Sequence, residues 1–98
     1  MVGTKGRGTN MASLVAACLS GDVPAEAALV VSPAEGTPAA LRAQALGVKV
    51  AVEPKSDDYP ERLMRLLREE RIGLICLAGY MFLLPEEVVR AYPDRILN

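Results

Sequence analysis

The amino-acid sequence predicts an α/β fold in which helices cover both faces of a parallel sheet, built as a single domain over residues 1–98. Short apolar runs alternate with helical segments of roughly ten to twelve residues, and this alternation is typical of parallel sheets. Two of the runs, 27–32 and 72–78, are apolar almost throughout, as strands covered on both faces are. Hydrophobic residues make up 51% of the chain, which is enough for one core.

The first helix is predicted over residues 9–19, where apolar side chains recur at the spacing of one helix face. These side chains are Met11, Leu14, Val15, Cys18 and Leu19. Ser20-Gly21-Asp22 ends the helix, because a glycine after the last turn is a common stop. Residues 1–4 are too few for a complete strand, so we expect the first strand to be absent or reduced to a stub.

The middle of the chain is predicted as strand, helix and strand. The apolar run 27–32 forms the first of these strands. Thr37 and Pro38 suit the N-cap and the first position of a helix that ends at Gly47. Residues 48–52 then form a short strand, followed by a polar loop.

The last part of the chain continues the same alternation. Asp58 is placed as the N-cap of a third helix that extends to about Arg71. The apolar run after it is the clearest strand pattern in the sequence. A loop at 79–84 leads to a short helix at 85–91, and residues 95–98 begin one more strand.

Three predicted loops lie at the carboxyl ends of strands, which is the edge where open parallel sheets bind ligands. They are residues 6–10, 32–36 and 79–84. Asn98 reaches the same edge at the end of its own strand. We therefore expect the functional residues along this edge.

The stretch Gly6-Arg7-Gly8-Thr9-Asn10 joins a glycine turn directly to the first helix. Such a turn presents free backbone N–H groups and the positive end of the helix dipole, which suit an anion such as phosphate. The dinucleotide motif G-x-G-x-x-G fails because Met11 stands at the third glycine position, and the P-loop motif fails because Thr9-Asn10 replaces Lys-Ser/Thr. On spacing alone, a purely structural turn remains the alternative.

Composition argues against several classes of protein. A net charge of −1 gives no basic footprint for nucleic acid. The longest nearly uncharged run, 72–85, is too short to span a membrane, and no segment has the pattern of an export signal. We therefore expect a cytoplasmic protein without nucleic-acid or membrane partners and without a metal. Cys18 and Cys76 are interpreted as small buried thiols, with a disulfide as the alternative.

Three motifs resemble those of glycinamide ribonucleotide formyltransferases. The first is the Gly-x-Gly-Thr-Asn loop at 6–10, which leads into an apolar helix. The second is Leu77-Ala78-Gly79-Tyr80-Met81 with Leu83-Leu84, and the third is Tyr92-Pro93-Asp94-Arg95-Ile96-Leu97-Asn98. They occur in the family's order and cover essentially the whole chain. The resemblance implies the Rossmann-like N-terminal fold of these enzymes, truncated at both ends.

The same resemblance implies a reaction and its residues. The family transfers a formyl group from 10-formyltetrahydrofolate, as co-substrate, to the amine of glycinamide ribonucleotide in purine biosynthesis. The implied phosphate-binding residues are Gly8, Thr9, Asn10, Met11 and Ala12. The implied folate-binding residues are Met81, Phe82, Leu83, Leu84 and Asn98. Asn98 is also the implied catalytic residue, since one amide donor to a developing oxyanion lowers a barrier by roughly 3–4 kcal/mol.

The chain departs from the family pattern where the general acid belongs. The family carries a histidine two residues after its asparagine and an aspartate further on, whereas these 98 residues contain no histidine and stop at Asn98. We therefore expect no appreciable formyl transfer by this chain alone, and either self-association or a partner chain that supplies the other half. Phe82 replaces an arginine of many members, and Ser56 lies near another such position, which leaves the affinity for folate open.

Two other interpretations stay open at this point. One is a different formyltetrahydrofolate-dependent enzyme, either a methionyl-tRNA formyltransferase or a formyltetrahydrofolate deformylase. The other is a non-catalytic fragment or subunit that binds a phosphate or a nucleotide. Titration with a ribose phosphate would separate a binding module from an inert fragment.

Overall fold

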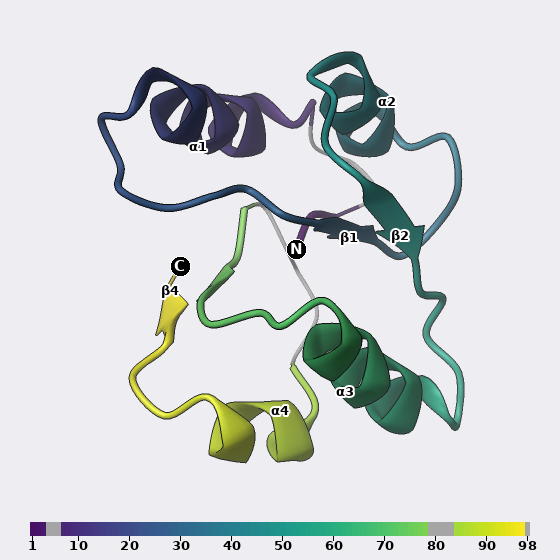
Figure 1. Ribbon diagram of the computed structural model, residues 1–98. Coiled ribbons are helices and arrows are strands. Elements are labelled where there is room, and N and C mark those ends of the chain that lie inside the picture. The colour runs from purple at the N-terminus through teal and green to yellow at the C-terminus, as the bar shows by residue number, and fades with distance from the viewer. Residues whose placement is uncertain (4–6, 79–83, 98) are drawn as a thin grey trace.

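A computed structural model of the chain describes residues 1–3, 7–78 and 84–97, and two parallel strand pairs form its centre (Figure 1). Strand β1 (Val30–Ser32) pairs with β2 (Val50–Val52), with Val31 opposite Ala51. Strand β3 (Ile75–Cys76) pairs with β4 (Ile96–Leu97). All the pairings are parallel, as the alternation of strands and helices predicts.

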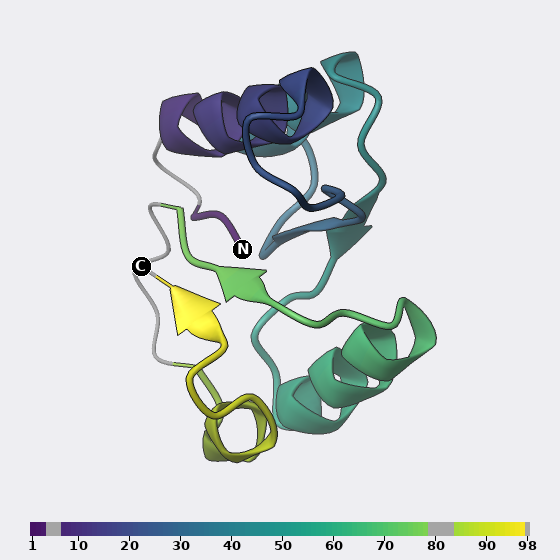
Figure 2. The same cartoon turned by 60° about the vertical axis from the view of Figure 1, so that its left-hand side comes forward.

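The first two residues lie between the two strand pairs (Figure 2). The Val2 N–H donates to the Val31 carbonyl at 3.0 Å, and the Ala78 N–H donates to the Met1 carbonyl at 2.9 Å. Val2 also forms a parallel bridge with Ala78. Met1 and Val2 therefore lie in the position of a central strand between β1 and β3.

The helices cover both faces of this arrangement, as predicted (Figure 1). Helices α1 (Thr9–Ser20) and α2 (Pro38–Ala45) lie on one side. Helices α3 (Tyr59–Glu69) and α4 (Glu86–Ala91) lie on the other. The chain therefore has the Rossmann-like α/β fold that the sequence predicts.

A separate apolar cluster fills each side. Under α1 and α2, the buried members are Val2, Met11, Val15, Val30, Ala39, Ala43 and Val48. Over α3 and α4, they are Val31, Tyr59, Leu63, Leu67, Ile75 and Val88. The side chains of Val30 and Val31 therefore lie on opposite faces of the sheet, as those of successive residues in a strand do.

Capping follows the prediction at two helix ends and departs from it at a third. Thr37 lies at the N-cap of α2 and its hydroxyl accepts from the Ala40 N–H at 3.2 Å. Gly21 ends α1 with a left-handed φ of 86°. Asp58 lies at the N-cap of α3, but its side chain makes no capping bond because it accepts from the Ser56 hydroxyl instead.

The strands are shorter than predicted. The apolar runs 27–32 and 72–78 contribute only Val30–Ser32 and Ile75–Cys76 as strand residues. A strand forms only where a neighbour pairs with it, and β2 pairs with the first run only at Val30–Ser32 while β4 pairs with the second only at Ile75–Cys76. Only Val30–Ser32 and Ile75 of these runs are buried, and Leu74 is 47% exposed, so hydrophobicity overestimates burial here as well as pairing.

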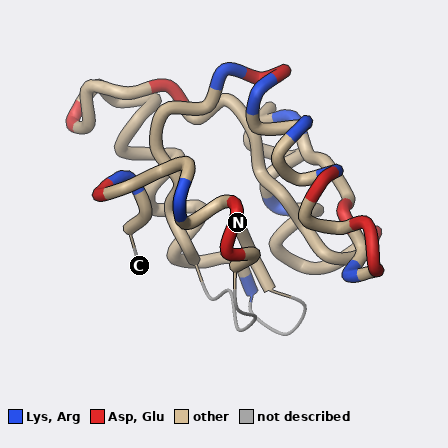
Figure 3. The backbone as a smooth tube through the Cα atoms, turned by 90° about the horizontal axis from the view of Figure 1, so that it is seen from below, with Lys and Arg blue, Asp and Glu red and all other residues tan. Residues whose placement is uncertain are grey.

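Charged residues are absent from the four strands and lie on the helices and loops, where both signs are interspersed (Figure 3). No helix in the described ranges is long and apolar enough to cross a membrane. Cys18 and Cys76 are free thiols. Both are only partly buried, whereas they were predicted to be buried.

Candidate functional site

The start of α1 packs directly against α2. Gly8 precedes α1 with a φ of 77°, a conformation that favours glycine. A Cβ atom placed on Gly8 would lie 2.8 Å from the Ala39 Cα and 3.0 Å from the Ala39 Cβ. Both the backbone conformation and the close contact with α2 therefore require glycine at this position.

The N-terminus of α1 carries backbone donors for which the described residues offer no acceptor. No described side chain caps it, and its first turn holds no acidic residue. The first helical bond runs from the Ala12 N–H to the Gly8 carbonyl at 2.8 Å. The N–H groups of Thr9, Asn10 and Met11 precede that bond, so the helix supplies no acceptor for them. Unsatisfied donors at the positive end of a helix dipole form an anion site.

The side chains of this turn differ in their surroundings. Those of Thr9 and Asn10 are exposed, and Ala12 is partly buried. Met11 is only 4% exposed and belongs to the core under α1, so only its backbone N–H faces the candidate site. The predicted phosphate residues therefore lie together, but they contribute different groups.

The neighbouring helix shows the contrast. Thr37 caps α2 and bonds the hydroxyl of buried Ser32 at 3.0 Å, while Ser32 donates to the Ala34 carbonyl at 2.7 Å. This network gives the start of α2 a side-chain acceptor for the Ala40 N–H, whereas no described side chain caps the start of α1. The bond between Ser32 and the capping Thr37 was not predicted, although a serine at the end of an apolar strand was a signal for it.

Segments of all three resemblance motifs meet beside α1. A pocket of about 280 Å³ is lined by Asn10 and Leu14 of α1, Leu77 and Ala78 after β3, and Leu97 of β4, with Cys76. The motifs are far apart in the sequence, yet the parallel strands bring them to one edge. The anion site thus opens next to the residues that lead to Gly79 and Asn98.

Several predicted residues cannot be placed. Met81, Phe82, Leu83 and Asn98 lie outside the described residues, and their roles stay predictions. Leu84 is described as a partly buried residue just before α4.

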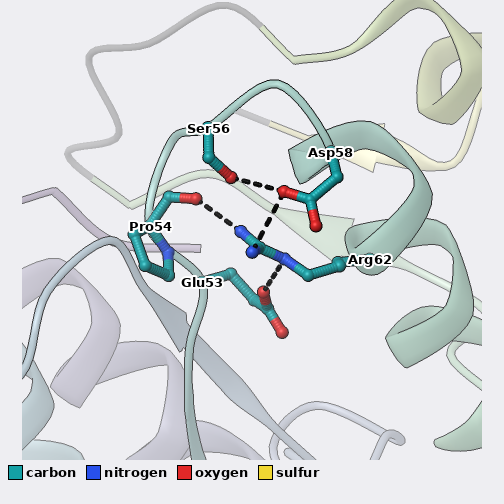
Figure 4. Close-up of polar contacts among 5 residues, drawn as sticks. All are labelled: Glu53, Pro54, Ser56, Asp58 and Arg62. Carbon is teal, nitrogen blue, oxygen red and sulfur yellow. Dashed lines mark hydrogen bonds and ion pairs between the residues drawn. The ribbon is translucent and has the colours of Figure 1, made fainter.

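The loop after β2 is fixed by Arg62, which the sequence analysis missed (Figure 4). The Arg62 guanidinium donates to the Pro54 carbonyl at 2.7 Å and lies 3.1 Å from the Glu53 carboxylate and 3.2 Å from that of Asp58. The hydrogen bond from Ser56, together with the charge of Arg62, lowers the pKa of Asp58. Arg62 therefore braces a loop on the same edge as the candidate site.

The residues that the structure describes contain no cluster of three or more histidine, cysteine or acidic side chains that could hold a metal. The described part of the candidate site consists of backbone donors, the Asn10 amide and apolar walls. Such a set can bind an anion and orient a substrate.

Comparisons with known proteins agree with this arrangement. The family model described as Formyl transferase matches residues 1–98. The chain is 35% identical to the chloroplastic phosphoribosylglycinamide formyltransferase of Arabidopsis thaliana, over 95% of this chain and 34% of that protein. It is 32% identical to the phosphoribosylglycinamide formyltransferase of Bacillus subtilis, over 95% of this chain and 50% of that protein.

The fold is also that of a solved relative. The crystal structure of glycinamide ribonucleotide transformylase 1 from Geobacillus kaustophilus matches with a TM-score of 0.86 and 33% identity, over 97% of this chain and 53% of that one. The chain thus spans between about a third and a half of the length of the relatives named here. By its sequence and its fold, this chain belongs to the formyl transferase family.

Proposed function

We propose that this chain is the phosphate-binding half of a phosphoribosylglycinamide formyltransferase. The complete enzyme would transfer a formyl group from 10-formyltetrahydrofolate to glycinamide ribonucleotide in purine biosynthesis. Relatives named as this enzyme support the activity. The observation that carries the proposal is the uncapped start of α1, because it opens where segments of all three motifs meet.

The phosphate of glycinamide ribonucleotide would accept from the N–H groups of Thr9, Asn10 and Met11. Gly8 allows the close turn that aims these donors outward. The Ala12 N–H already donates to the Gly8 carbonyl, so Ala12 would adjoin the phosphate and not bond it. The folate-binding roles of Met81, Phe82, Leu83 and Leu84, and the role of Asn98 in oxyanion stabilisation and folate binding, belong to the same proposal.

The chemistry needs a group that this chain lacks. Formyl transfer takes a proton from the attacking amine and gives one to the departing folate nitrogen, and histidine is the side chain best suited to such proton transfer near neutral pH. The chain contains none. We therefore propose that these 98 residues by themselves bind without turnover, and that activity needs a proton-transfer group from outside them. A cytoplasmic location stays a prediction, since one relative is named chloroplastic.

The binding half of the proposal is tested by calorimetric titration with glycinamide ribonucleotide. The Asn10→Asp variant keeps the shape of the side chain but places a negative charge in the first turn of α1, beside the proposed phosphate. We expect it to weaken binding at least about tenfold, while the helix dipole leaves folding stability equal or higher. Gln44→Glu, an exposed position on α2, makes the same charge change as the matched control and should leave the affinity unchanged.

Two results would overturn the proposal. One is an absence of saturable binding by the folded chain. The other is an Asn10→Asp affinity equal to that of the wild type. Formyl transfer is assayed separately on protein of verified mass, and measurable turnover by the 98-residue chain would contradict the claim that it needs such a group. Binding of simple ribose phosphates as tight as that of glycinamide ribonucleotide would favour the non-catalytic binding module instead.

A further inference from the structure

A charged residue lies beside the start of α1 without a partner. Arg7 immediately precedes Gly8 and is exposed. Among the described residues, no carboxylate forms an ion pair with Arg7 and no hydrogen bond involves its guanidinium. Arg62, by contrast, contacts two carboxylates of the chain. The guanidinium of Arg7 is therefore available to a ligand of the candidate site.

The helices next to Arg7 offer no charge that would neutralise it. None of the residues of α1, Thr9–Ser20, is acidic or basic. The start of α2, which contacts Gly8 through Ala39, has no acidic residue in its first turn. Glu35, in the loop before α2, is exposed and forms no ion pair within the described residues. Helices α3 and α4, on the other side of the sheet, do carry acidic residues in their first turns (Figure 1).

The position of Arg7 is electrostatically unfavourable as long as no anion is bound. The N-terminus of a helix carries a partial positive charge, so acidic groups stabilise it and basic groups destabilise it. Arg7 lies one residue before the N-cap of α1, and no acidic residue lies in the first turn of that helix. An anion held by the backbone donors of this turn reverses the effect, because it attracts both the helix end and the guanidinium.

The charge of a phosphate monoester exceeds what the helix end alone supplies. Such a group carries about −1.5 to −2 near neutral pH, against roughly +0.5 from the helix dipole. The other described groups at the site are the neutral amide of Asn10 and apolar side chains such as Leu14 and Leu97. Arg7 supplies a full positive charge, and a planar guanidinium donates two parallel hydrogen bonds to phosphate oxygens. The described part of the site therefore matches a dianion only when Arg7 takes part.

We propose that Arg7 is a specificity residue of the candidate site and selects a doubly charged phosphate monoester over a singly charged one. Its guanidinium pairs with the phosphate that the N–H groups of Thr9, Asn10 and Met11 hold. The inference rests on the proposed function, since it takes the phosphate of glycinamide ribonucleotide as the ligand. It adds a residue outside the predicted set 8–12 and a charge selectivity that backbone donors, with their partial charges, supply only weakly.

The test compares two ligands that differ in charge. The first is glycinamide ribonucleotide at pH 8, where its phosphate is a dianion. The second is the methyl ester of the same phosphate, which carries a single negative charge. Each ligand is titrated calorimetrically into the 98-residue chain. We expect the wild type to bind the dianion at least about tenfold more tightly than the ester.

Three variants isolate the contribution of Arg7. Arg7→Gln removes the charge and should weaken binding of the dianion about tenfold, while its affinity for the ester changes little, so most of the selectivity is lost. Arg7→Lys keeps the charge and should retain most of the selectivity. Arg65→Gln makes the same charge change at an exposed position of α3, on the other side of the sheet, and should leave both affinities unchanged.

Stability gives a readout of the opposite sign. Arg7→Gln removes the repulsion between the guanidinium and the helix end, so urea unfolding without ligand should show a stability equal to or higher than that of the wild type. Added salt screens the charge pair, so the affinity for the dianion should fall more steeply with salt in the wild type than in Arg7→Gln. A purely structural role of Arg7 would move neither the salt dependence nor the selectivity.

Three results would overturn the inference: equal selectivity of the wild type and Arg7→Gln, the same loss in Arg7→Lys as in Arg7→Gln, or an equal loss in Arg65→Gln. In each case the proposed function stands, because the wild type still binds glycinamide ribonucleotide. If the wild type binds neither ligand, the proposed function and the role of Arg7 are both wrong.

Discussion

Replacement of Gly8 by alanine tests the contact on which the start of α1 depends. The residue has a φ of 77°, and a side chain in this conformation costs about 1 kcal/mol. The new Cβ would also lie 2.8 Å from the backbone of Ala39, and forced overlap in a packed region costs about 1–3 kcal/mol. We expect Gly8→Ala to lower the free energy of unfolding by about 2–4 kcal/mol, a large part of the stability of a small domain.

The matched control is Gly21→Ala at the other end of α1. Gly21 has a similar φ of 86°, but a Cβ atom there meets nothing within 4 Å. This variant therefore carries the conformational cost alone, about 1 kcal/mol. Equilibrium urea unfolding, followed by far-ultraviolet circular dichroism, measures both. If Gly8→Ala is no more destabilising than Gly21→Ala, the close contact between α1 and α2 does not constrain the turn, and the reasoning is refuted.

Three further predictions concern stability and use the same unfolding assay. Thr37→Ala should cost about 1–2 kcal/mol through loss of the α2 cap, with Thr37→Ser restoring most of it; equal stability of all three proteins would contradict this. Leu63→Ala should cost about 2–5 kcal/mol because Leu63 is fully buried, whereas Leu41→Ala, at an exposed position, should change stability by less than about 0.5 kcal/mol. Burial lowers the pKa of the Met1 amine from 8.0 to about 6, so the unfolded chain takes up a proton first and stability should fall by about 2 kcal/mol as the pH drops from 8 to 6. An N-acetylated chain should lack this pH dependence, and an identical dependence in both forms would contradict the assignment.

Local patterns predicted most of the elements. The spacing of Met11, Leu14 and Val15 predicted α1, and Thr37 with Pro38 predicted the start of α2, because helix faces and caps are decided within one or two turns of the chain. The strands were predicted in the right order but too long. A strand exists only where a neighbour pairs with it, and the sequence of one segment does not contain its neighbour.

The candidate site was also predicted only in part, because local patterns do not contain contacts with distant segments. The glycine turn is predicted as an anion site because its donors lie within five consecutive residues. The distinction between exposed Asn10 and buried Met11 within that turn needed the packing of α1 on the sheet. The bracing of the loop after β2 by Arg62 joins residues several positions apart, and no periodic pattern marks it.

The sequence by itself determined the α/β class, the helix ends and the family, because each depends on short motifs and on their order along the chain. The tertiary structure alone decided three features. Met1 and Val2 take the central position, Gly8 contacts Ala39, and Asn10 lies beside Leu97. Each of these depends on a contact between residues far apart in the sequence, and only packing of the whole chain brings such residues together.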